Sequence, residues 1–453
     1  MHIVILGNGI SGITAARHIR QHSDHSITVV SDEADFFFSR TALMYVYMGH
    51  LRFQDTQPYE SWFWKKNRIQ LRRARVERID FQAKKLVLNA GENMAYDRLL
   101  LAVGSKSNKF GWPGQDLEGV RGLYHKQDLE AMENHAISRE KHTDARAVVV
   151  GGGLIGIEMV EMFHSRHIPV TFLVREAAFW DNILPPEESA MVTRHLQEHR
   201  IDLRLETELQ EIVPTATGQV QAVVTKQGDS IPCGYVGITV GVSPNIDFLK
   251  DSGLELGKGI LVNEYLETNL PDVYAIGDCA ELRSPPPGRR PIEAVWYVGR
   301  IMGETVAHTV CGQRTRYNPG IWFNSAKFFD IEYQTYGDIR AKLADEQATV
   351  YWEHPDGKKS IRVTYETSSG KVLGFNLMGV RYRHEVCDRW IAGGATMETV
   401  LPNLGLANFD PEFYPQHEAE LVQRYNQQTG KNLQLRRQRG LSAVLEFLKN
   451  CDV

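Results

Sequence analysis

The sequence predicts an α/β protein with two Rossmann-like folds, followed by a smaller C-terminal α+β domain. Two strand–glycine loop–helix–strand patterns predict the pair of folds, one starting at residue 2 and the other at residue 147. In the last part of the chain, three strand patterns at 348–352, 360–365 and 372–379 are separated by turn signals. From residue 385 onward the pattern is helical and polar.

Composition and charge exclude several classes of protein. The chain has 453 residues, of which 42% are hydrophobic and 24% charged, as in ordinary globular proteins of several domains. The net charge of −5 does not favour nucleic acid or an anionic membrane as a partner. No apolar run approaches the roughly 18 residues of a transmembrane helix. The N-terminus begins directly with a strand pattern, and the five cysteines are scattered without a CxxC pair, so we expect a cytoplasmic protein.

The first glycine loop has the spacing of a dinucleotide-binding turn. An apolar strand at 2–6 precedes it, a helical pattern follows it, and a second strand lies at 27–30. In such a loop the first glycine permits the turn, the second lets the backbone reach a pyrophosphate, and the third lets the helix pack on the strand. The N–H groups at the start of the helix then bind phosphate oxygens. The expected cofactor-binding residues here are Gly7, Gly9, Ile10, Ser11 and Gly12.

The second loop repeats the first. It follows an apolar strand at 147–150 and precedes a helical pattern that runs to about His164, and the next strand lies at 170–174. Two such units indicate two nucleotide-binding folds. The expected cofactor-binding residues in this loop are Gly151, Gly153, Leu154, Ile155 and Gly156.

Three further apolar strands end in glycine, at 96–104, 235–241 and 272–278. Together with the two loops, in this order, they resemble the flavoproteins with two dinucleotide-binding domains, the pyridine nucleotide–disulfide oxidoreductase superfamily. The resemblance covers about residues 1–315. It implies two Rossmann-like dinucleotide-binding domains, with the NAD(P)-binding domain inserted in the FAD-binding domain, plus a C-terminal α+β domain with a helical tail. The expected boundaries are 1–118 and 241–318 for FAD, 119–240 for NAD(P), and 319–453 for the last domain.

The resemblance also assigns individual residues to FAD. Asp278 is expected to hydrogen-bond the ribityl chain or the pyrophosphate end, with a helix N-cap as the alternative. Asp32 is favoured for the adenosine ribose, while Glu33 either assists it or is a solvated turn residue. Arg40 is expected beside the FAD phosphates, and a surface arginine is the alternative. Five more residues complete the expected cofactor-binding set: Val76, Ala102, Gly104, Gly241 and Gly277.

Missing cysteines separate branches of this superfamily. The disulfide-reducing branches carry redox cysteines after the FAD-binding βαβ unit, but residues 36–49 contain none. The chain therefore resembles the branch with ferredoxin and rubredoxin reductases and apoptosis-inducing factor, whose third domain has a stretch similar to Trp322–Ser325. Tyr45 stands where that branch often has a lysine that pairs with a glutamate, here Glu158. We expect Tyr45 and Glu158 to be catalytic residues, joined by a hydrogen bond in place of the ion pair.

The nicotinamide cofactor is expected to be NADH. Glu176 follows the second strand of the inserted domain, where an acid accepts a hydrogen bond from the ribose 2′-hydroxyl. Arg175 beside it suits a 2′-phosphate, so NADPH stays open.

The expected function is transfer of hydride from NAD(P)H to FAD and of electrons onward to a redox protein or small-molecule acceptor. One alternative is a membrane-associated NADH–quinone reductase, supported only by the amphipathic segment 441–448. The other is a redox-sensing interaction protein of the apoptosis-inducing-factor type. The sixteen histidines give no recognised ligand spacing, so no metal is expected, and the basic stretch 431–439 is interpreted as a solvated face rather than a docking site. The oligomeric state is left open, a homodimer being one option.

Overall fold

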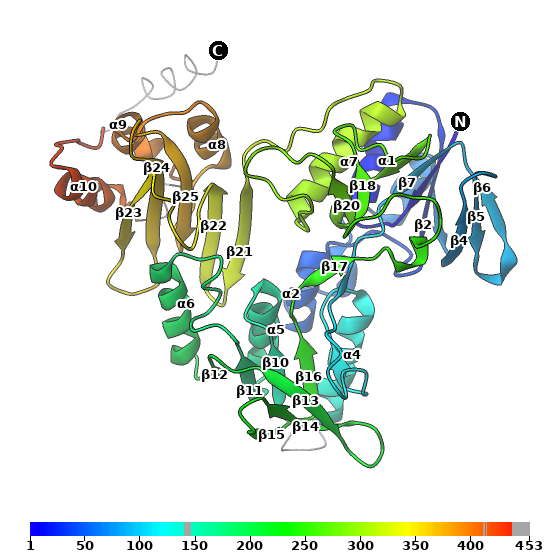
Figure 1. Ribbon diagram of the computed structural model, residues 1–453, viewed down its shortest axis with the longest axis horizontal. Coiled ribbons are helices and arrows are strands. Elements are labelled where there is room, and N and C mark those ends of the chain that lie inside the picture. Colours follow the sequence, from blue (N-terminus) through cyan, green and yellow to red (C-terminus); the bar gives the residue numbers. More distant parts are fainter. Residues whose placement is uncertain (140–145, 411–412, 414, 437–453) are drawn as a thin grey trace. The chain divides into compact units, whose positions relative to one another are not determined.

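The computed structural model describes residues 1–139, 146–410, 413 and 415–436 (Figure 1). They form two compact units, one of Met1–Ala177 with Arg200–Pro319 and the other of Ala178–His199 with Gly320–Val453. The amphipathic segment 441–448 and the end of the basic stretch 431–439 lie outside the described residues. No helix within the described ranges combines the length and apolar character that a bilayer crossing needs.

The first unit contains a five-stranded parallel sheet in the order β19-β7-β1-β2-β3. Val4 and Ile5 in its central strand are fully buried, which explains the continuous apolar run, because a parallel sheet is covered on both faces. Helices α1 and α7 pack against each other beside it. The elements are β1 (His2–Leu6), β2 (Ser26–Ser31), β3 (Ile69–Arg73), β7 (Arg98–Leu101), β19 (Val273–Ala275), α1 (Ile10–His22) and α7 (Trp296–Val310).

A second five-stranded parallel sheet of the same unit has the order β12-β11-β10-β16-β9. Its central strand β10 is again fully buried, and α5 packs on β10 and β11. The elements are β9 (Val120–Arg121), β10 (Ala147–Val150), β11 (Val170–Leu173), β12 (Asp202–Arg204), β16 (Tyr235–Ile238), α4 (Lys126–Arg139) and α5 (Leu154–Ser165). Both predicted strand–loop–helix–strand units are therefore present.

Smaller elements complete the first unit. Two antiparallel three-stranded sheets have the orders β4-β5-β6 and β13-β14-β15, β8 pairs with β17, and β18 pairs with β20. Their bounds are β4 (Val76–Asp80), β5 (Lys85–Leu88), β6 (Asn93–Ala95), β8 (Ser105–Ser107), β13 (Leu209–Pro214), β14 (Val220–Thr225), β15 (Ser230–Pro232), β17 (Val242–Pro244), β18 (Ile260–Val262) and β20 (Ala280–Leu282). The short helices are η1 (Arg40–Ala42), α2 (Leu43–Tyr47), η2 (Phe53–Thr56), α3 (Ser61–Lys66), η3 (Asn89–Gly91), η4 (Asp247–Leu249) and η5 (Gly277–Cys279).

The second unit is built on an antiparallel sheet in the order β21-β22-β25-β24-β23. The three predicted strands are confirmed as β23 (Gln347–Glu353), β24 (Ser360–Glu366) and β25 (Val372–Met378), and the structure adds β21 (Phe323–Phe328) and β22 (Ile331–Gly337). Helix α8 packs on β22 and β25, and α10 packs on β23. The helices after the sheet are α8 (His384–Ala392), α9 (Met397–Val400), η6 (Leu401–Leu406) and α10 (Glu418–Thr429).

Helix α6 (Pro186–Glu198) belongs to this second unit, although in sequence it lies between β11 and β12. Figure 1 draws it in green beside the yellow strands of the antiparallel sheet. A buried ion pair holds it there: the guanidinium of Arg362 in β24 donates to the carboxylate of Glu188 at 2.8 Å, with side chains 4% and 0% exposed. Asn376 donates to the same carboxylate at 3.2 Å. The local sequence pattern of α6 does not indicate this placement.

Candidate functional site

The first glycine loop has one open glycine between two that packing requires. Gly7 has φ +114°, and a Cβ there would lie 2.1 Å from the carbonyl oxygen of Ala102. A Cβ on Gly12 would lie 2.1 Å from the carbonyl oxygen of Gly7. Around Gly9, by contrast, no heavy atom of a described residue lies within 4 Å of that position. The loop therefore leaves space at its second glycine, where a ligand backbone can approach closely.

The second loop repeats this geometry. Gly151 also has φ +114°, with a Cβ position 2.6 Å from the carbonyl oxygen of Thr239, and that of Gly156 lies 2.1 Å from the carbonyl oxygen of Gly151. The Thr239 hydroxyl donates to the carbonyl oxygen of Val150 at 2.8 Å, which holds the strand end against the loop. Among the described residues, no heavy atom comes within 4 Å of a Cβ on Gly153.

Neither helix that follows a glycine loop has a side-chain cap among the described residues. The N-caps of α1 and α5 are the extended glycines Gly9 and Gly153. The first turns, Ile10–Gly12 and Leu154–Gly156, consist of neutral residues. Backbone N–H groups and the positive end of the helix dipole therefore suit a phosphate at each loop. This donor set fits the pyrophosphates of FAD and of a nicotinamide dinucleotide.

Glu33 forms a bidentate ion pair with Arg40. The two terminal guanidinium nitrogens donate to the two carboxylate oxygens at 2.8 and 2.6 Å, and the backbone N–H of Lys126 donates to the same carboxylate at 2.9 Å. Burial acts to raise the pKa of Glu33, but the hydrogen bonds from His125 and Arg40 outweigh it and hold the pKa well below its ordinary range. The Glu33 side chain is 11% exposed, so the alternative of a solvated turn residue is wrong. Asp32 is exposed, and its contact with the ribose stays a prediction.

Tyr124 connects Arg40 to Asp278. Arg40 donates to the backbone carbonyl of Tyr124, and its guanidinium carbon lies 4.5 Å from the centre of that ring. The Tyr124 hydroxyl in turn donates to the Asp278 carboxylate at 3.0 Å. Burial raises the pKa of Asp278, against the opposing effects of the Tyr124 hydrogen bond and the Arg40 charge. The alternative of a helix N-cap is wrong, since Asp278 lies inside η5, whose N-cap is Ile276, and α7 is capped at Val295.

The remaining residues of the expected cofactor-binding set lie beside Tyr124, beside the first loop, or at or after the ends of strands. Gly104 (φ +65°) would place a Cβ 2.8 Å from the Tyr124 hydroxyl, and Gly277 (φ +73°) would place one 2.3 Å from the Ser11 hydroxyl. Gly104 and Gly277 therefore border Tyr124 and the first loop. Ala102 follows β7, Val76 begins β4, and Gly241 follows β16.

On the nicotinamide side, Glu176 is paired with its neighbour. The Arg175 Nε donates to the Glu176 carboxylate at 2.7 Å, and the side chains are 71% and 21% exposed. One residue separates the pair from the end of β11, so the pair follows the second strand of the inserted domain as the sequence predicts.

Comparison with known proteins matches residues 1–308 to the family described as pyridine nucleotide-disulphide oxidoreductase. The chain belongs to this family. Rhodocoxin reductase of Rhodococcus erythropolis is 30% identical over 338 residues, covering 72% of this chain and 76% of that protein. Nitrite reductase (NAD(P)H) of Bacillus subtilis is 28% identical over 361 residues, and the chain spans only 43% of its length. A solved NAD-dependent persulfide reductase from A. fulgidus has a TM-score of 0.82 at 25% identity, covering 95% of this chain and 84% of that one.

Membership in the pyridine nucleotide-disulphide oxidoreductase family confirms the resemblance and the fold class predicted from the sequence. Membership implies an oxidoreductase that uses FAD and a nicotinamide dinucleotide, and this activity stays a prediction. The roles of its individual residues stay predictions.

Two residues expected to be catalytic lie on neighbouring helices of the first unit, Tyr45 on α2 and Glu158 on α5, and these helices are in contact. Burial raises the pKa of Glu158 to about 7, with a further contribution from Glu161. The Tyr45 ring stacks on His50, with centroids 6.2 Å apart. The hydrogen bond between Tyr45 and Glu158 stays a prediction.

The four cysteines in the described ranges are free thiols in environments that favour the uncharged form. Cys233, Cys279 and Cys387 are buried and Cys311 is half-buried. Burial raises the pKa of Cys233 and of Cys279 to about 12 and that of Cys387 further. A reactive thiol needs a lowered pKa, so the environment of these residues opposes thiolate chemistry.

Proposed function

We propose that the protein is an NADH-dependent reductase that passes electrons through bound FAD to a small redox protein. The matched geometry of the two glycine loops carries this proposal, because Gly9 and Gly153 each leave open space at the start of a helix. Two such loops on two parallel sheets support two dinucleotides, one FAD and one NADH. Rhodocoxin reductase, by its name a reductase of a redox protein, supports the class of acceptor.

In this proposal the residues of the first loop bind the pyrophosphate of FAD, together with Arg40. Arg40 is suited to this role because Glu33 holds its guanidinium in a fixed orientation. Asp278, fixed by Tyr124, is assigned to the ribityl chain or the pyrophosphate end. When bound, FAD supplies the chemistry of hydride acceptance and onward electron release.

The second loop and Glu176 are assigned to NADH. The N–H groups of Leu154, Ile155 and Gly156 suit its pyrophosphate, and the Glu176 carboxylate suits the ribose 2′-hydroxyl. Glu158 and Tyr45 are assigned as the residues that orient the reacting ring. A carboxyl group with a pKa near 7 also exchanges a proton within the working pH range.

Electrons are proposed to leave the flavin without a cysteine intermediate. The cysteines of the described residues are buried or half-buried, and burial raises the pKa of each thiol. Their thiolate fraction at neutral pH is therefore very small, and a thiolate relay would be slow. In this proposal the acceptor is therefore an external electron carrier, not a thiol of the described residues.

The test is reoxidation of the enzyme after anaerobic reduction by one equivalent of NADH. The reduced protein is mixed in a stopped-flow instrument with rubredoxin, a [2Fe–2S] ferredoxin, ferricyanide, a soluble quinone, oxygen or a low-molecular-weight disulfide. We expect fast reoxidation by ferricyanide and by rubredoxin, the ferredoxin or both. Reoxidation by the disulfide is expected to be slow. Reoxidation by the disulfide alone would overturn the proposal, and so would purified protein without bound flavin.

A further inference from the structure

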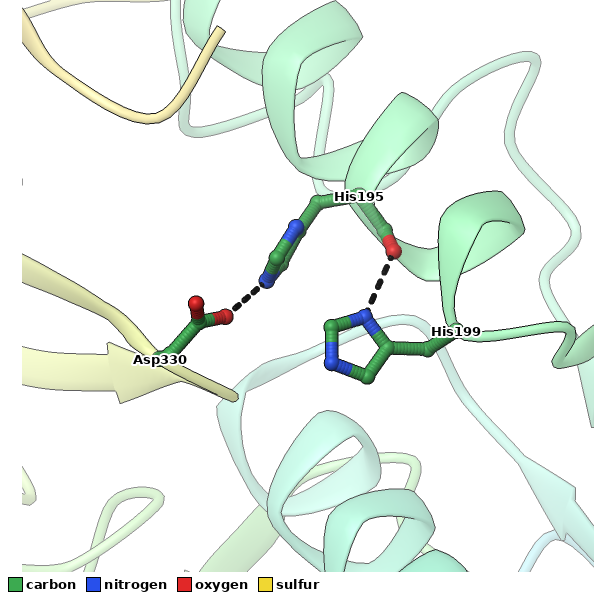
Figure 2. A group of neighbouring side chains, drawn as sticks. All are labelled: His195, His199 and Asp330. Carbon is green, nitrogen blue, oxygen red and sulfur yellow. Dashed lines mark hydrogen bonds and ion pairs between the residues drawn. The ribbon is translucent and has the colours of Figure 1, made fainter. Parts of the chain in front are cut away.

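Two histidines and an aspartate meet at the end of α6 in the second unit. His195 and His199 are one helical turn apart, and Asp330 lies in the two-residue turn between β21 and β22 (Figure 2). One ligand atom from each of the three side chains lies within 4.8 Å of the others. The expectation that the histidines have no ligand spacing does not hold for His195 and His199, because α6 places these i, i+4 positions together at one helix end.

The hydrogen bonds of the two rings determine which nitrogens face the cluster. Nδ1 of His199 lies 3.1 Å from the backbone carbonyl oxygen of His195, which only accepts, so Nδ1 carries the proton and Nε2 the lone pair. Nδ1 of His195 lies 3.5 Å from the Glu198 carboxylate, and its Nε2 hydrogen-bonds the carboxylate of Asp330. Metal-binding histidines typically donate their other ring N–H to a carbonyl or carboxylate in this way.

The surroundings hold these side chains in place. The His195 side chain is 2% exposed, and the buried Arg362–Glu188 pair anchors α6 to the sheet. Nζ of Lys358 binds the second carboxylate oxygen of Asp330 at 2.9 Å, so the first oxygen is the one directed at His195. The Asp330 side chain is 56% exposed, which gives solvent access to the cluster.

We propose that His195, His199 and Asp330 bind a divalent transition-metal ion such as Zn²⁺, with water as a further ligand. Two imidazoles and one carboxylate suit Zn²⁺, Co²⁺, Ni²⁺ or Cu²⁺, whereas Ca²⁺ and Mg²⁺ prefer oxygen ligands alone. Three protein ligands plus water complete a tetrahedral zinc site. The ion replaces the proton between His195 and Asp330 and links the end of α6 to the β21–β22 turn, so it stabilises the second unit. The proposal is independent of the assigned electron acceptor.

The charge of Lys358 works against the ion. A cation bound to one oxygen of Asp330 is repelled by the ammonium group on the other oxygen. The variant Lys358→Gln keeps all three ligands and removes this charge, so it is expected to bind the metal severalfold more tightly than the wild type.

The test is titration of untagged, chelator-treated holoenzyme with Co²⁺, followed by displacement with Zn²⁺. We expect one Co²⁺ per chain, detected as ligand-field absorption at wavelengths beyond the oxidised flavin bands. His199→Gln and Asp330→Asn are each expected to weaken binding at least about tenfold, or about 1.4 kcal/mol. These two substitutions leave the buried His195 unchanged. The matched control is His354→Gln, because His354 forms a similar pair with Asp356 at 3.0 Å, yet the described residues give that pair no third ligand.

Thermal unfolding gives a second readout that does not depend on spectra. Zn²⁺ is expected to raise the midpoint of the wild type and of His354→Gln in proportion to the logarithm of its concentration, and to raise those of His199→Gln and Asp330→Asn much less. Absence of stoichiometric Co²⁺ binding to the wild type would overturn the proposal. Equal binding by the wild type, His199→Gln and Asp330→Asn would overturn it as well.

Discussion

The carboxylate of Glu33 accepts hydrogen bonds from both terminal nitrogens of Arg40, at 2.8 and 2.6 Å. The same carboxylate accepts from the backbone N–H of Lys126, at the start of α4. One side chain therefore ties together the end of β2, the η1 turn and the segment that leads into the second parallel sheet. It also fixes the guanidinium that reaches the carbonyl of Tyr124.

The first prediction is that Glu33→Gln destabilises the apoprotein and lowers its FAD occupancy. The amide keeps the shape of the side chain but loses the charge that holds Arg40, and we expect a loss of about 2 kcal/mol in the free energy of unfolding. Denaturant titration of the apoprotein and the flavin-to-protein absorbance ratio are the measurements. Asp55→Asn is the matched control, because it breaks the exposed ion pair of Asp55 with Arg52 and should leave both values unchanged.

The Glu33–Arg40 ion pair also predicts how the free energy of unfolding depends on pH. The pKa of Glu33 lies below its ordinary value in the folded protein, so its contribution is fully present above the unfolded-state pKa of about 4.3 and is lost as pH falls below it. The wild type and Glu33→Gln should therefore differ most at pH 6–8, roughly, and converge in acid. A difference that grows toward low pH would contradict this assignment.

The second prediction compares substitutions of the two open glycines, Gly9 and Gly153. Gly9 and Gly153 have φ values of −72° and −103°, which alanine adopts without strain, so Gly9→Ala and Gly153→Ala should both fold. Each Cβ would occupy space that we assign to a pyrophosphate. Gly9→Ala is expected to weaken FAD binding at least about tenfold, while Gly153→Ala keeps FAD and raises KM for NADH by a similar factor. Each variant is the control of the other, and identical effects of the two would refute the assignment of one cofactor to each loop.

The glycine loops were predictable because their pattern is local: a strand, a turn and a helix within about 30 residues encode the geometry. Tyr124 was missed because its partners are distant in sequence, Arg40 by 84 positions and Asp278 by 154. The placement of α6 was missed for the same reason, since the Arg362–Glu188 contact spans 174 positions. The partly exposed strand β21 lacks the apolar run that identifies buried strands.

The third prediction concerns the choice of nicotinamide dinucleotide. Because Arg175 pairs with Glu176 at 2.7 Å, removal of the acid frees the guanidinium for a 2′-phosphate. Glu176→Ala is expected to narrow the preference for NADH over NADPH, and Arg175→Ala to widen it, each by about threefold to tenfold. Stopped-flow flavin reduction with both nucleotides measures this. A wild type that clearly prefers NADPH would exclude the role assigned to Glu176.

The fourth prediction concerns Glu158, whose pKa burial raises to about 7. A carboxyl group whose pKa is raised on folding contributes stability below its unfolded-state pKa of about 4.3, and this stability is lost as pH rises toward 7. Glu158→Gln should therefore become more stable than the wild type by pH 8, by a free energy of unfolding on the order of 2 kcal/mol. Denaturant titrations at pH 5 and pH 8, roughly, test this without activity. If Glu158 also acts on the reacting ring, the rate of flavin reduction by NADH should show an inflection near pH 7 that Glu158→Gln removes.

The last prediction is that no thiol becomes reactive when NADH reduces the flavin. Burial raises the pKa of Cys279 to about 12, and its sulfur lies 3.4 Å from the carbonyl oxygen of Leu101, so the thiol form is strongly favoured at neutral pH. Reduction by two electrons should therefore produce no long-wavelength charge-transfer band, and iodoacetamide should leave Cys233, Cys279 and Cys387 unmodified until the protein is denatured. Cys387→Ser should keep NADH–ferricyanide turnover within about tenfold of the wild type, or about 1.4 kcal/mol of barrier. A thiol that is alkylated only after reduction would show that electrons pass through a cysteine. A structural cysteine does not become an exposed thiolate when the flavin is reduced.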